Sequence, residues 1–467
     1  MDKELIIVSN RVPLNITRRK GKIYHKKSVG GLVTALDPIL ARRGGKWIGW
    51  DGHINEDSSL SKINIKEKSS DIGYDIEFMS LSTKQVSQYY HGFSNRSIWP
   101  LFHGFILHSY FNLDYWKRYI EVNKKFSDAV LKKVNDDSTV FIQDYHLMVL
   151  PGMMRKEKKN LTLLFFLHIP FPNYEIFRVL PWDKKVLDGL LGCNLIGLQT
   201  NHDVENFLGV CDKILKADVD YENRIVKTYK KKTFVNNFPI SIDYKKFSNI
   251  ANRKTTKKAA ENIKKEASGC KIILSIERLD YTKGIRERIL SIERFFEKYP
   301  SYKKKVTFLQ VSVPSRTKVQ EYIQFKKEID ELVGHINGRF AEGMWTPINY
   351  LYRTLPQTKL ISYYLASDVC LLTPLRDGMN LVAKEYISSK IDLDGVLVLS
   401  EFAGAAEEMK DHTVMVNPFD IEEVADGINK ALKMGKRERS VRIALLQKLI
   451  KKNDIYSWSK RIINYMD

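Results

Sequence analysis

Polar and small residues interrupt the segment TPLRDGMNLVAKE, residues 373–385, where neither a strand nor a helix needs them. The preceding run SDVCLLT is typical of a buried strand, and LVAKEYISSK is typical of a helix. Gly378, Met379 and Asn380 lead into this helix, whose first N–H groups favour an anion such as a diphosphate. Asp377 would accept hydrogen bonds from sugar hydroxyls. The segment therefore predicts a site for a sugar that carries phosphate.

Three cations elsewhere in the second half also suit phosphate groups. Arg278, Lys283 and Arg316 each follow an apolar run. Arginine binds phosphate through two parallel hydrogen bonds, and lysine acts as a point charge. Gly30 and Gly31, at another helix start, would let the backbone approach a ligand closely. Because the sequence has no Walker A motif and no carboxylate cluster, we expect a nucleotide held by protein cations, with no metal and no cofactor.

Polar residues also follow the apolar runs of the first half. Asn10 and Arg11 end the run LIIVSNR, Asp144 follows TVFIQ, and His168 follows LLFFL. Ligands of open α/β sheets bind beyond the carboxyl ends of the strands. We therefore expect these side chains to share a site with a ligand.

Each of these residues also has a purely structural explanation. Asp144 would cap the following helix, and His168 would be a core histidine. Arg278 would form an ion pair with Asp280, and Lys283 would be a turn residue. A ligand site explains all of them at once, so we prefer that interpretation.

The elements that must position these residues are apolar strands alternating with helices. This rhythm runs from ELIIVSNR near the start to GVLVLSEFAGAAEEM near the end, and it indicates parallel sheets covered on both faces. We expect an α/β protein of two doubly wound domains, residues 1–240 and residues 241–467, facing across a cleft. The segment TFVNNFPISIDYKKF, residues 233–247, is the expected linker. The last helix would pack back onto either domain.

Composition excludes several other classes of protein. The chain has 467 residues and a net charge of +21, but its lysines are scattered with few aromatics between them, so we expect no nucleic acid partner. The cysteines share no CxxC spacing, which indicates a reducing, cytoplasmic location. No signal peptide and no apolar stretch of membrane-spanning length is present, so we expect no membrane association.

Long motifs in matching order resemble trehalose-6-phosphate synthases, the retaining enzymes of glycosyltransferase family 20. They include VSNR, YYHGFSNRSIWP, QDYHLMVLP, FFLHIPFPNYEIFRVLPW, SIERLDYTKGI, VPSRTKVQEY, TPLRDGMNLVAKEY and LVLSEFAGAAEE. The resemblance runs from residue 5 to about residue 463. It implies the GT-B fold of two Rossmann-like domains. It also implies transfer of glucose from UDP-glucose to glucose 6-phosphate, giving α,α-trehalose 6-phosphate.

The resemblance assigns roles by motif. Arg278 and Lys283 would bind the donor diphosphate, and His168 would contact the transferring glucose. Asp377 joins these three as the catalytic set. The donor-binding positions are Gly30, Gly31, Arg278, Lys283, Leu355, Asp377, Gly378, Met379, Asn380, Leu381, Val382 and Glu385. The acceptor-binding positions are Arg11, Tyr90, Trp99, Asp144 and Arg316.

The sequence departs from the family pattern at two places. The loop VPLNITRRKGKIYHKKSVGG is longer and more basic than in short bacterial members, and Ser241 stands where the family often has glycine. A related synthase with another phosphorylated acceptor, such as a glucosylglycerol-phosphate or validoxylamine-type synthase, is the nearest alternative; His146 favours the trehalose version. The other alternative is a non-catalytic sugar-phosphate sensor, but such a protein would lack the donor-site cations.

The expected partners are the two substrates. ADP-glucose and GDP-glucose stay open as donors, because the base would be read through backbone atoms near Leu355. A homo-oligomer also stays open. Because no phosphatase domain is apparent, a separate trehalose-6-phosphate phosphatase is expected.

Overall fold

The computed structural model describes residues 4–19, 22–27, 31–54, 73–228, 231–317 and 319–466. Contacts within the chain divide it into two compact units. The first unit is Met1–Ile240 with Tyr456–Asp467, and the second unit is Ser241–Ile455. The chain thus leaves the first unit once and returns to it at the end.

The first unit is built on a mixed sheet, described here with the strand order β5-β4-β1-β6-β7-β8-β11-β10-β9. Neighbours from β5 to β11 are parallel, and β10 is antiparallel to both β9 and β11. The strands are β1 (Leu5–Arg11), β4 (Lys46–Ile54), β5 (Asp75–Leu81), β6 (Thr139–Gln143), β7 (Thr162–Phe166), β8 (Leu195–Leu198), β9 (Asp218–Asp220), β10 (Ile225–Thr228) and β11 (Lys231–Asn237).

Central strands of this sheet are buried along their whole length. Every residue of β6 and β8 is buried, as expected for apolar runs covered on both faces. The helices of this unit are α1 (Gly31–Arg43), α2 (Thr83–Gln85), α3 (Trp99–Phe102), α4 (Leu113–Leu131), α5 (Leu150–Glu157), α6 (Tyr174–Phe177), α7 (Asp183–Leu190), α8 (Asn201–Val210) and α18 (Ile455–Ile463). Two π-type helices are η2 (Val86–Ile98) and η5 (Cys211–Leu215), and three short 3-10 turns are η3 (Ile106–His108), η4 (Tyr145–Leu147) and η9 (Asn464–Met466).

The last helix, α18, completes the core of the first unit. Trp458 is fully buried, and its indole N–H donates to the carbonyl of Phe238 at 2.9 Å. Its ring also packs edge-on against Phe166 of β7. The end of the chain is therefore part of the sheet's packing and not an appendage.

The second unit is a parallel sheet, described here with the order β14-β13-β12-β15-β16-β17. Its strands are β12 (Lys271–Arg278), β13 (Val306–Val313), β14 (Ile348–Tyr352), β15 (Val369–Leu372), β16 (Val396–Ser400) and β17 (Val414–Val416). Its helices are α9 (Tyr244–Asn252), α10 (Lys254–Glu266), α11 (Ile285–Lys298), α12 (Gln320–Phe340), α13 (Gln357–Ala366), α14 (Leu381–Ser389), α15 (Ala406–Met409), α16 (Ile421–Lys433) and α17 (Lys436–Lys452). Three short turns are η6 (Tyr281–Lys283), η7 (Pro300–Tyr302) and η8 (Lys410–His412).

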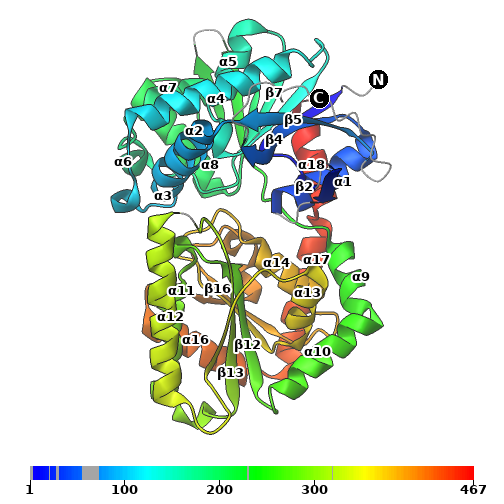
Figure 1. Cartoon of the computed structure of the whole chain (residues 1–467), viewed down its shortest axis with the longest axis vertical. Helices are drawn as coiled ribbons and strands as arrows, with labels where there is room; N and C mark the ends of the chain where they lie inside the picture. The colour runs from blue at the N-terminus through cyan, green and yellow to red at the C-terminus, as the bar shows by residue number, and fades with distance from the viewer. Residues whose placement is uncertain are drawn as a thin grey trace. The chain divides into compact units, whose positions relative to one another are not determined.

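Helices cover both faces of this second sheet (Figure 1). α11, α12 and α16 lie on one face, and α9, α10, α13 and α14 lie on the other. Phe295 of α11, Ile329 of α12 and Ile428 of α16 are fully buried against Phe308 of β13 and Val398 of β16. This arrangement is the doubly wound Rossmann-like architecture that the alternation of strands and helices predicts, and that prediction is confirmed.

Two segments differ from the sequence-based expectations. Only residues 238–243 of the expected linker 233–247 lie outside regular structure, because β11 extends to Asn237 and α9 begins at Tyr244. The basic loop after β1 contains a hairpin of β2 (Leu14–Arg19) and β3 (Lys22–Lys27), paired antiparallel. Within the described ranges, none of the helices combines the length and apolar character that a membrane span requires.

Candidate functional site

The order of strands places a topological switch point between β12 and β15 in the second unit. β12 pairs with β13 on one side and with β15 on the other, so the chain reverses its direction of winding there. Ligands of doubly wound sheets bind at the carboxyl ends of the strands at such a point. Arg278 is the last residue of β12, and Asp377 follows β15 by five residues. Arg278 and Asp377 therefore lie at the same end of the sheet, on either side of the switch point.

The loop after β12 is held in place by its own side chains and by one glycine. Asp280 accepts hydrogen bonds from the N–H and the hydroxyl of Thr282, at 3.1 and 3.0 Å. Gly284 follows with a φ of 62°, and a Cβ atom there would lie 2.2 Å from the carbonyl oxygen of Thr373. Only glycine fits this position, so Lys283 is presented between the two strand ends by a fixed turn.

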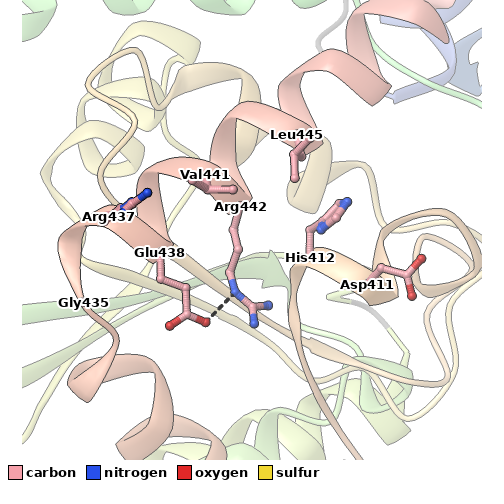
Figure 2. A pocket seen from close by; sticks show the side chains of 8 residues that line it. All are labelled: Asp411, His412, Gly435, Arg437, Glu438, Val441, Arg442 and Leu445. Atoms are coloured by element: carbon pink, nitrogen blue, oxygen red, sulfur yellow. Dashed lines mark hydrogen bonds and ion pairs between the residues drawn. The ribbon is translucent and has the colours of Figure 1, made fainter.

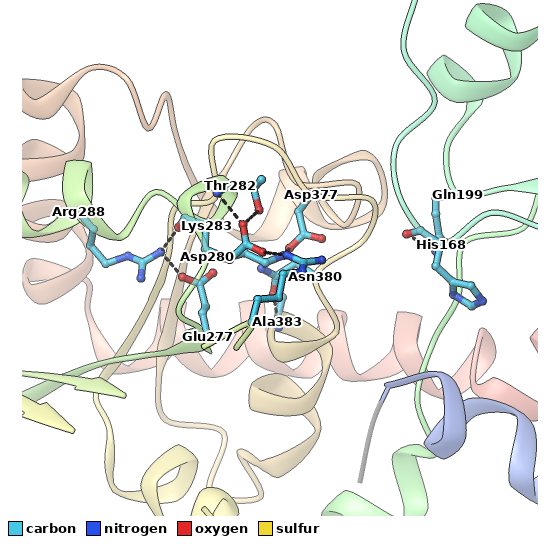
Figure 3. Close-up of polar contacts among 11 residues, drawn as sticks. His168, Gln199, Glu277, Asp280, Thr282, Lys283, Arg288, Asp377, Asn380 and Ala383 are labelled. Atoms are coloured by element: carbon cyan, nitrogen blue, oxygen red, sulfur yellow. Dashed lines mark hydrogen bonds and ion pairs between the residues drawn. The ribbon is translucent and has the colours of Figure 1, made fainter. Parts of the chain in front are cut away.

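Lys283, Asp377 and Asn380 form the polar centre of this end of the sheet (Figure 3). The Lys283 Nζ lies 2.5 Å from Asp377 Oδ2, and Asn380 Nδ2 donates to the same oxygen at 3.2 Å. Asn380 caps α14 by accepting the N–H of Ala383 at 3.2 Å, and its φ is 75°. Both charged side chains are largely buried. A lysine, a carboxylate and a helix N-terminus thus surround one point, which suits a sugar linked to a phosphate.

Residues 402–405 hold the loop that carries Asp377. The N–H of Asp377 donates to the carbonyl of Phe402, and the N–H of Gly404 donates to the carbonyl of Asp377. A Cβ atom on Gly404 would lie 1.9 Å from the carbonyl oxygen of Gly378. The motif EFAGAAEE therefore supports the donor loop through backbone contacts. This role of Gly404 was not predicted from the sequence, although the glycine is part of the motif.

Asp280 is the buried carboxylate of this cluster. Arg316 donates to Asp280 Oδ2 at 2.6 Å and also contacts the hydroxyl of Tyr322, which itself donates to that carboxylate. Burial alone would raise the pKa of Asp280, but the charges of Arg316, Arg278 and Lys283 outweigh it and lower that pKa. Arg316, expected at the acceptor phosphate, is therefore placed on Asp280 beside the donor cations, with a left-handed φ of 46°.

The remaining donor positions lie on α14 or at the sheet edge. Leu381 and Val382 begin α14, where N–H groups have no acceptor within the helix, and Met379 is buried just before them. Glu385, one turn further, accepts the Tyr364 hydroxyl at 2.9 Å, and burial raises the pKa of Glu385 to about 7. Leu355 lies between β14 and α13, at the edge of the sheet and away from the switch point.

The first unit has its own switch point, between β1 and β6. β1 pairs with β4 on one side and with β6 on the other. Arg11 ends β1, Asp144 follows β6 and His168 follows β7 shortly after. The predicted polar residues of the first half therefore lie together at the carboxyl ends of neighbouring parallel strands. Gly31 begins α1, whereas Gly30 lies outside the described residues.

Aromatic rings form a continuous support for Arg11. The Arg11 guanidinium lies 4.9 Å from the ring centre of Trp50, and Trp50 packs edge-on against Tyr90. Tyr90 in turn stacks on His146 at 5.7 Å, with the ring planes 13° apart. Burial lowers the pKa of Arg11, opposed by the nearby Tyr90 and Asp51. Trp50, which was not predicted from the sequence, thus links the cation to the predicted Tyr90.

Asp144 holds a backbone conformation that is costly for any residue but glycine. Its φ is 74° and its ψ is 168°, and its side chain does not cap the following turn. Asp144 Oδ1 instead accepts the backbone N–H of His168 at 3.1 Å. The helix-cap explanation for this aspartate is therefore wrong. Strain of this kind persists where the surrounding structure imposes it, and it is concentrated at functional sites.

His168 and Trp99 occupy different depths at this edge. The His168 Nε2 lies 2.9 Å from Gln143 Oε1, and burial lowers the pKa of His168 to about 3, so the ring is neutral. Figure 3 shows it beside Gln199, whose Nε2 contacts the His168 carbonyl at 3.4 Å. Trp99 is buried and packs on Tyr145, the neighbour of His146, so it supports the aromatic wall from behind.

Two cavities lie away from both switch points. One, of about 540 Å³, lies beside α17 and is lined by Val441, Leu445, Arg442 and His412 among others (Figure 2). The other, of about 400 Å³, lies between α1 and α18. Neither includes a predicted site residue. Among the described residues, no group of three or more His, Cys, Asp and Glu side chains is placed to hold a metal ion.

Comparisons with known proteins concern the family and the fold of this chain. The family model described as Glycosyltransferase family 20 matches residues 3–467. The chain is 38% identical to the trehalose-6-phosphate synthase of Mycobacterium sp. (strain KMS), covering 99% of this chain and 95% of that protein. It is also similar to the crystal structure of an alpha,alpha-trehalose-phosphate synthase (UDP-forming) from Burkholderia xenovorans in complex with glucose-6-phosphate, with a TM-score of 0.91 and 30% identity over 99% of each chain. A trehalose-6-phosphate structure from E. coli bound with UDP-2-fluoro glucose gives a TM-score of 0.90 and 35% identity, covering 99% of this chain and 98% of that one.

Proposed function

This chain belongs to glycosyltransferase family 20 and has its GT-B fold, and we propose that it transfers glucose from UDP-glucose to glucose 6-phosphate, forming α,α-trehalose 6-phosphate and UDP. One similar structure contains glucose-6-phosphate, and another contains UDP-2-fluoro glucose. Both substrates therefore have a counterpart among proteins that share the fold of this chain.

The observation that carries the proposal is the grouping of Lys283, Asp377 and Asn380 at the N-terminus of α14. A diphosphate needs fixed positive charge and N–H donors, and a sugar needs hydrogen-bond acceptors for its hydroxyls. Asp377 Oδ2 already receives hydrogen bonds from two donors, so its orientation is fixed before a sugar arrives. A sugar diphosphate satisfies all three groups together, whereas a simple phosphate would leave the carboxylate unused.

The chemistry breaks one bond and forms one bond at the same carbon. The bond from the anomeric carbon of the donor glucose to the diphosphate breaks, and its electron pair leaves with UDP. The anomeric hydroxyl of glucose 6-phosphate forms the new bond, and its proton passes to the departing diphosphate oxygen. Attack from the side of the leaving group retains the configuration. Arg278 and Lys283 stabilise the charge that develops on the diphosphate, which is the largest contribution such a site makes.

The acceptor is bound by the edge of the first unit. Arg11 supplies the charge for the 6-phosphate, and the wall of Trp50, Tyr90 and His146 bounds the hexose. Asp144, whose Oδ1 accepts the His168 N–H, also accepts a hydrogen bond from a sugar hydroxyl, since each carboxylate oxygen can accept more than one hydrogen bond. The neutral ring of His168 adds no charge to this end of the sheet.

A direct assay tests the proposal. Purified protein is incubated with glucose 6-phosphate or glycerol 3-phosphate and with UDP-, ADP- or GDP-glucose, and the product is identified by NMR. We expect α,α-trehalose 6-phosphate from glucose 6-phosphate and UDP-glucose. A product from glycerol 3-phosphate alone would show that the acceptor is wrong, and no transfer from any pair would refute the function.

Lys283→Met tests the role of the grouping itself. Loss of one cation that stabilises a developing charge costs about 3 kcal/mol, so we expect a rate about 100-fold lower. Lys271→Met is the matched control, because Lys271 pairs with Asp368 at the opposite end of β12. Equal effects of both changes would contradict a role for Lys283 in transfer.

Further parts of the proposal concern the cellular setting. The reaction needs no metal, so excess EDTA leaves the rate unchanged. The product is dephosphorylated by a separate phosphatase. The mass of the protein in light scattering gives the oligomeric state of this chain. The cytoplasm is the compartment in which the free thiols Cys193, Cys211 and Cys370, all buried, stay reduced and both substrates are available.

A further inference from the structure

A further arginine, Arg288, is almost completely buried beside the donor loops. Arg288, in the first turn of α11, is 1% exposed and donates to four groups. Its Nη2 donates to Glu277 Oε2 at 2.6 Å and to the backbone carbonyl of Lys283 at 2.9 Å. Its Nε donates to the hydroxyl of Thr373 at 2.9 Å, and its Nη1 donates to Gln310 Oε1 at 3.3 Å. One guanidinium thus contacts β12, β13 and the residue that follows β15.

Two of these contacts fix the loops on which the proposed donor site depends. The carbonyl of Lys283 belongs to the turn that presents the lysine amine, and Thr373 begins the segment that leads to Asp377. Backbone contacts reinforce the link, because the N–H groups of Leu375 and Arg376 both donate to the carbonyl of Thr282. Arg288 therefore joins the loop after β12 to the loop after β15. Figure 3 shows its guanidinium beside Lys283 and Glu277.

The ion pair of Arg288 with Glu277 contributes little net stability, because both charged groups must lose their hydration to be buried. Both side chains are fully buried, and Glu277 Oε1 has no hydrogen-bond partner among the described residues. A buried ion pair is seldom more stabilising than apolar residues of similar volume. A planar guanidinium, however, can hold several acceptors in fixed directions, which an apolar side chain cannot do.

We propose that Arg288 is a positioning residue for the donor diphosphate, since it holds the loops of Lys283 and Asp377 in one arrangement. This inference rests on the proposed function. The residue touches neither substrate. Its effect reaches the ligand through the Lys283 amine, so it acts on binding of the diphosphate and not on binding of the nucleoside.

Arg288→Lys is the test variant, and calorimetric binding of UDP and of uridine is the readout. A lysine retains the charge that faces Glu277 but cannot reach the Lys283 carbonyl and Thr373 together. We expect the Kd of UDP to rise at least about tenfold, with the Kd of uridine changed less than about twofold. Because small displacements of positioning groups cost about 100-fold in rate, kcat/KM for UDP-glucose should fall by about that factor.

Arg439→Lys is the matched control in the same unit. Arg439 also pairs with a carboxylate, Asp394, and also donates to a backbone carbonyl, that of Met434, both at 2.6 Å. None of these partners belongs to a donor loop. We expect this variant to lose stability to urea while its UDP affinity stays that of the wild type.

Thr373→Val provides a second variant with almost unchanged shape, in case Arg288→Lys does not fold. It removes only the acceptor of the Arg288 Nε, and we expect a smaller rise in the Kd of UDP in the same direction. Equal UDP affinity in the folded variants and the wild type would overturn the inference. So would a parallel loss of UDP and uridine affinity, which indicates a merely structural role. A wild type that binds UDP but transfers no glucose refutes the proposed function alone.

Discussion

The backbone conformation of Asp144 predicts that glycine is more stabilising than alanine at this position, which is the reverse of the usual order. Its φ of 74° and ψ of 168° lie in a region that costs a non-glycine residue about 1–3 kcal/mol. Asp144→Ala and Asp144→Gly both remove the hydrogen bond to the His168 N–H, so that loss cancels between them. Only glycine also relieves the strain. At an ordinary position glycine is instead less stable than alanine by about 0.4–1 kcal/mol, because the unfolded chain is freer.

The two effects leave a measurable difference at Asp144. We expect Asp144→Gly to be more stable than Asp144→Ala by about 1 kcal/mol, the strain relief minus the entropy cost. Asp137→Ala and Asp137→Gly are the controls, because Asp137 is exposed in the turn before β6 and its φ is not positive. There we expect alanine to be the more stable variant.

Urea unfolding followed by tryptophan fluorescence measures this difference. The chain has seven tryptophans, and all but Trp345 lie in the first unit, so the signal reports mainly on the unit that contains Asp144. Neither Asp144 variant should transfer glucose at the wild-type rate. If Asp144→Ala is the more stable of the pair, the backbone at Asp144 is not strained.

Three further changes test other parts of the site. Gly404→Ala places a Cβ atom 1.9 Å from the Gly378 carbonyl oxygen, so the KM for UDP-glucose should rise while the KM for glucose 6-phosphate stays the same. Gly334→Ala is the control, because the space around Gly334 is open, and it should change neither KM. Glu385→Gln should flatten the pH dependence of stability. Because burial raises the pKa of Glu385 in the folded state to about 7, the wild type loses up to about 3 kcal/mol of unfolding free energy as pH rises from 4.5 to 7. Urea unfolding of both proteins at the two pH values measures this loss. Equal slopes for the two proteins would contradict this. Trp50→Leu removes the ring beneath Arg11, a contact worth about 0.5–2 kcal/mol, and should raise the KM for glucose 6-phosphate by about 2-fold to about 30-fold. An equal rise for UDP-glucose would point to a general distortion.

The sequence was most informative where a residue acts through its own side chain at a strand end. The runs that became β1, β6, β7, β12 and β15 are continuous and apolar, so both their burial and the polar residues after them could be predicted. Arg11, Asp144, Arg278 and Asp377 were identified in this way. Their grouping at two switch points needed the order of strands, which follows from pairing and not from the pattern of a single strand.

The sequence was least informative where a residue acts through a partner distant in the chain. Arg288 reads as one charge among many on an amphipathic helix, and its burial depends on contacts with Thr373 and Gln310. The pairing of Arg316 with Asp280 has the same origin. Tyr90 was singled out by motif, but the π-type winding of η2 that carries it has no recognised sequence pattern.

The route of the chain through its two units has a practical consequence. The N–H of Ile455 donates to the carbonyl of Ile242 at 3.1 Å, so the entrance and exit of the second unit are adjacent, and both chain termini belong to the first unit. The second unit is thus an insertion into the sequence of the first unit, and its two ends are adjacent. A fragment of residues 241–455 should fold by itself and retain affinity for UDP, which would make the nucleotide-reading half exchangeable between relatives.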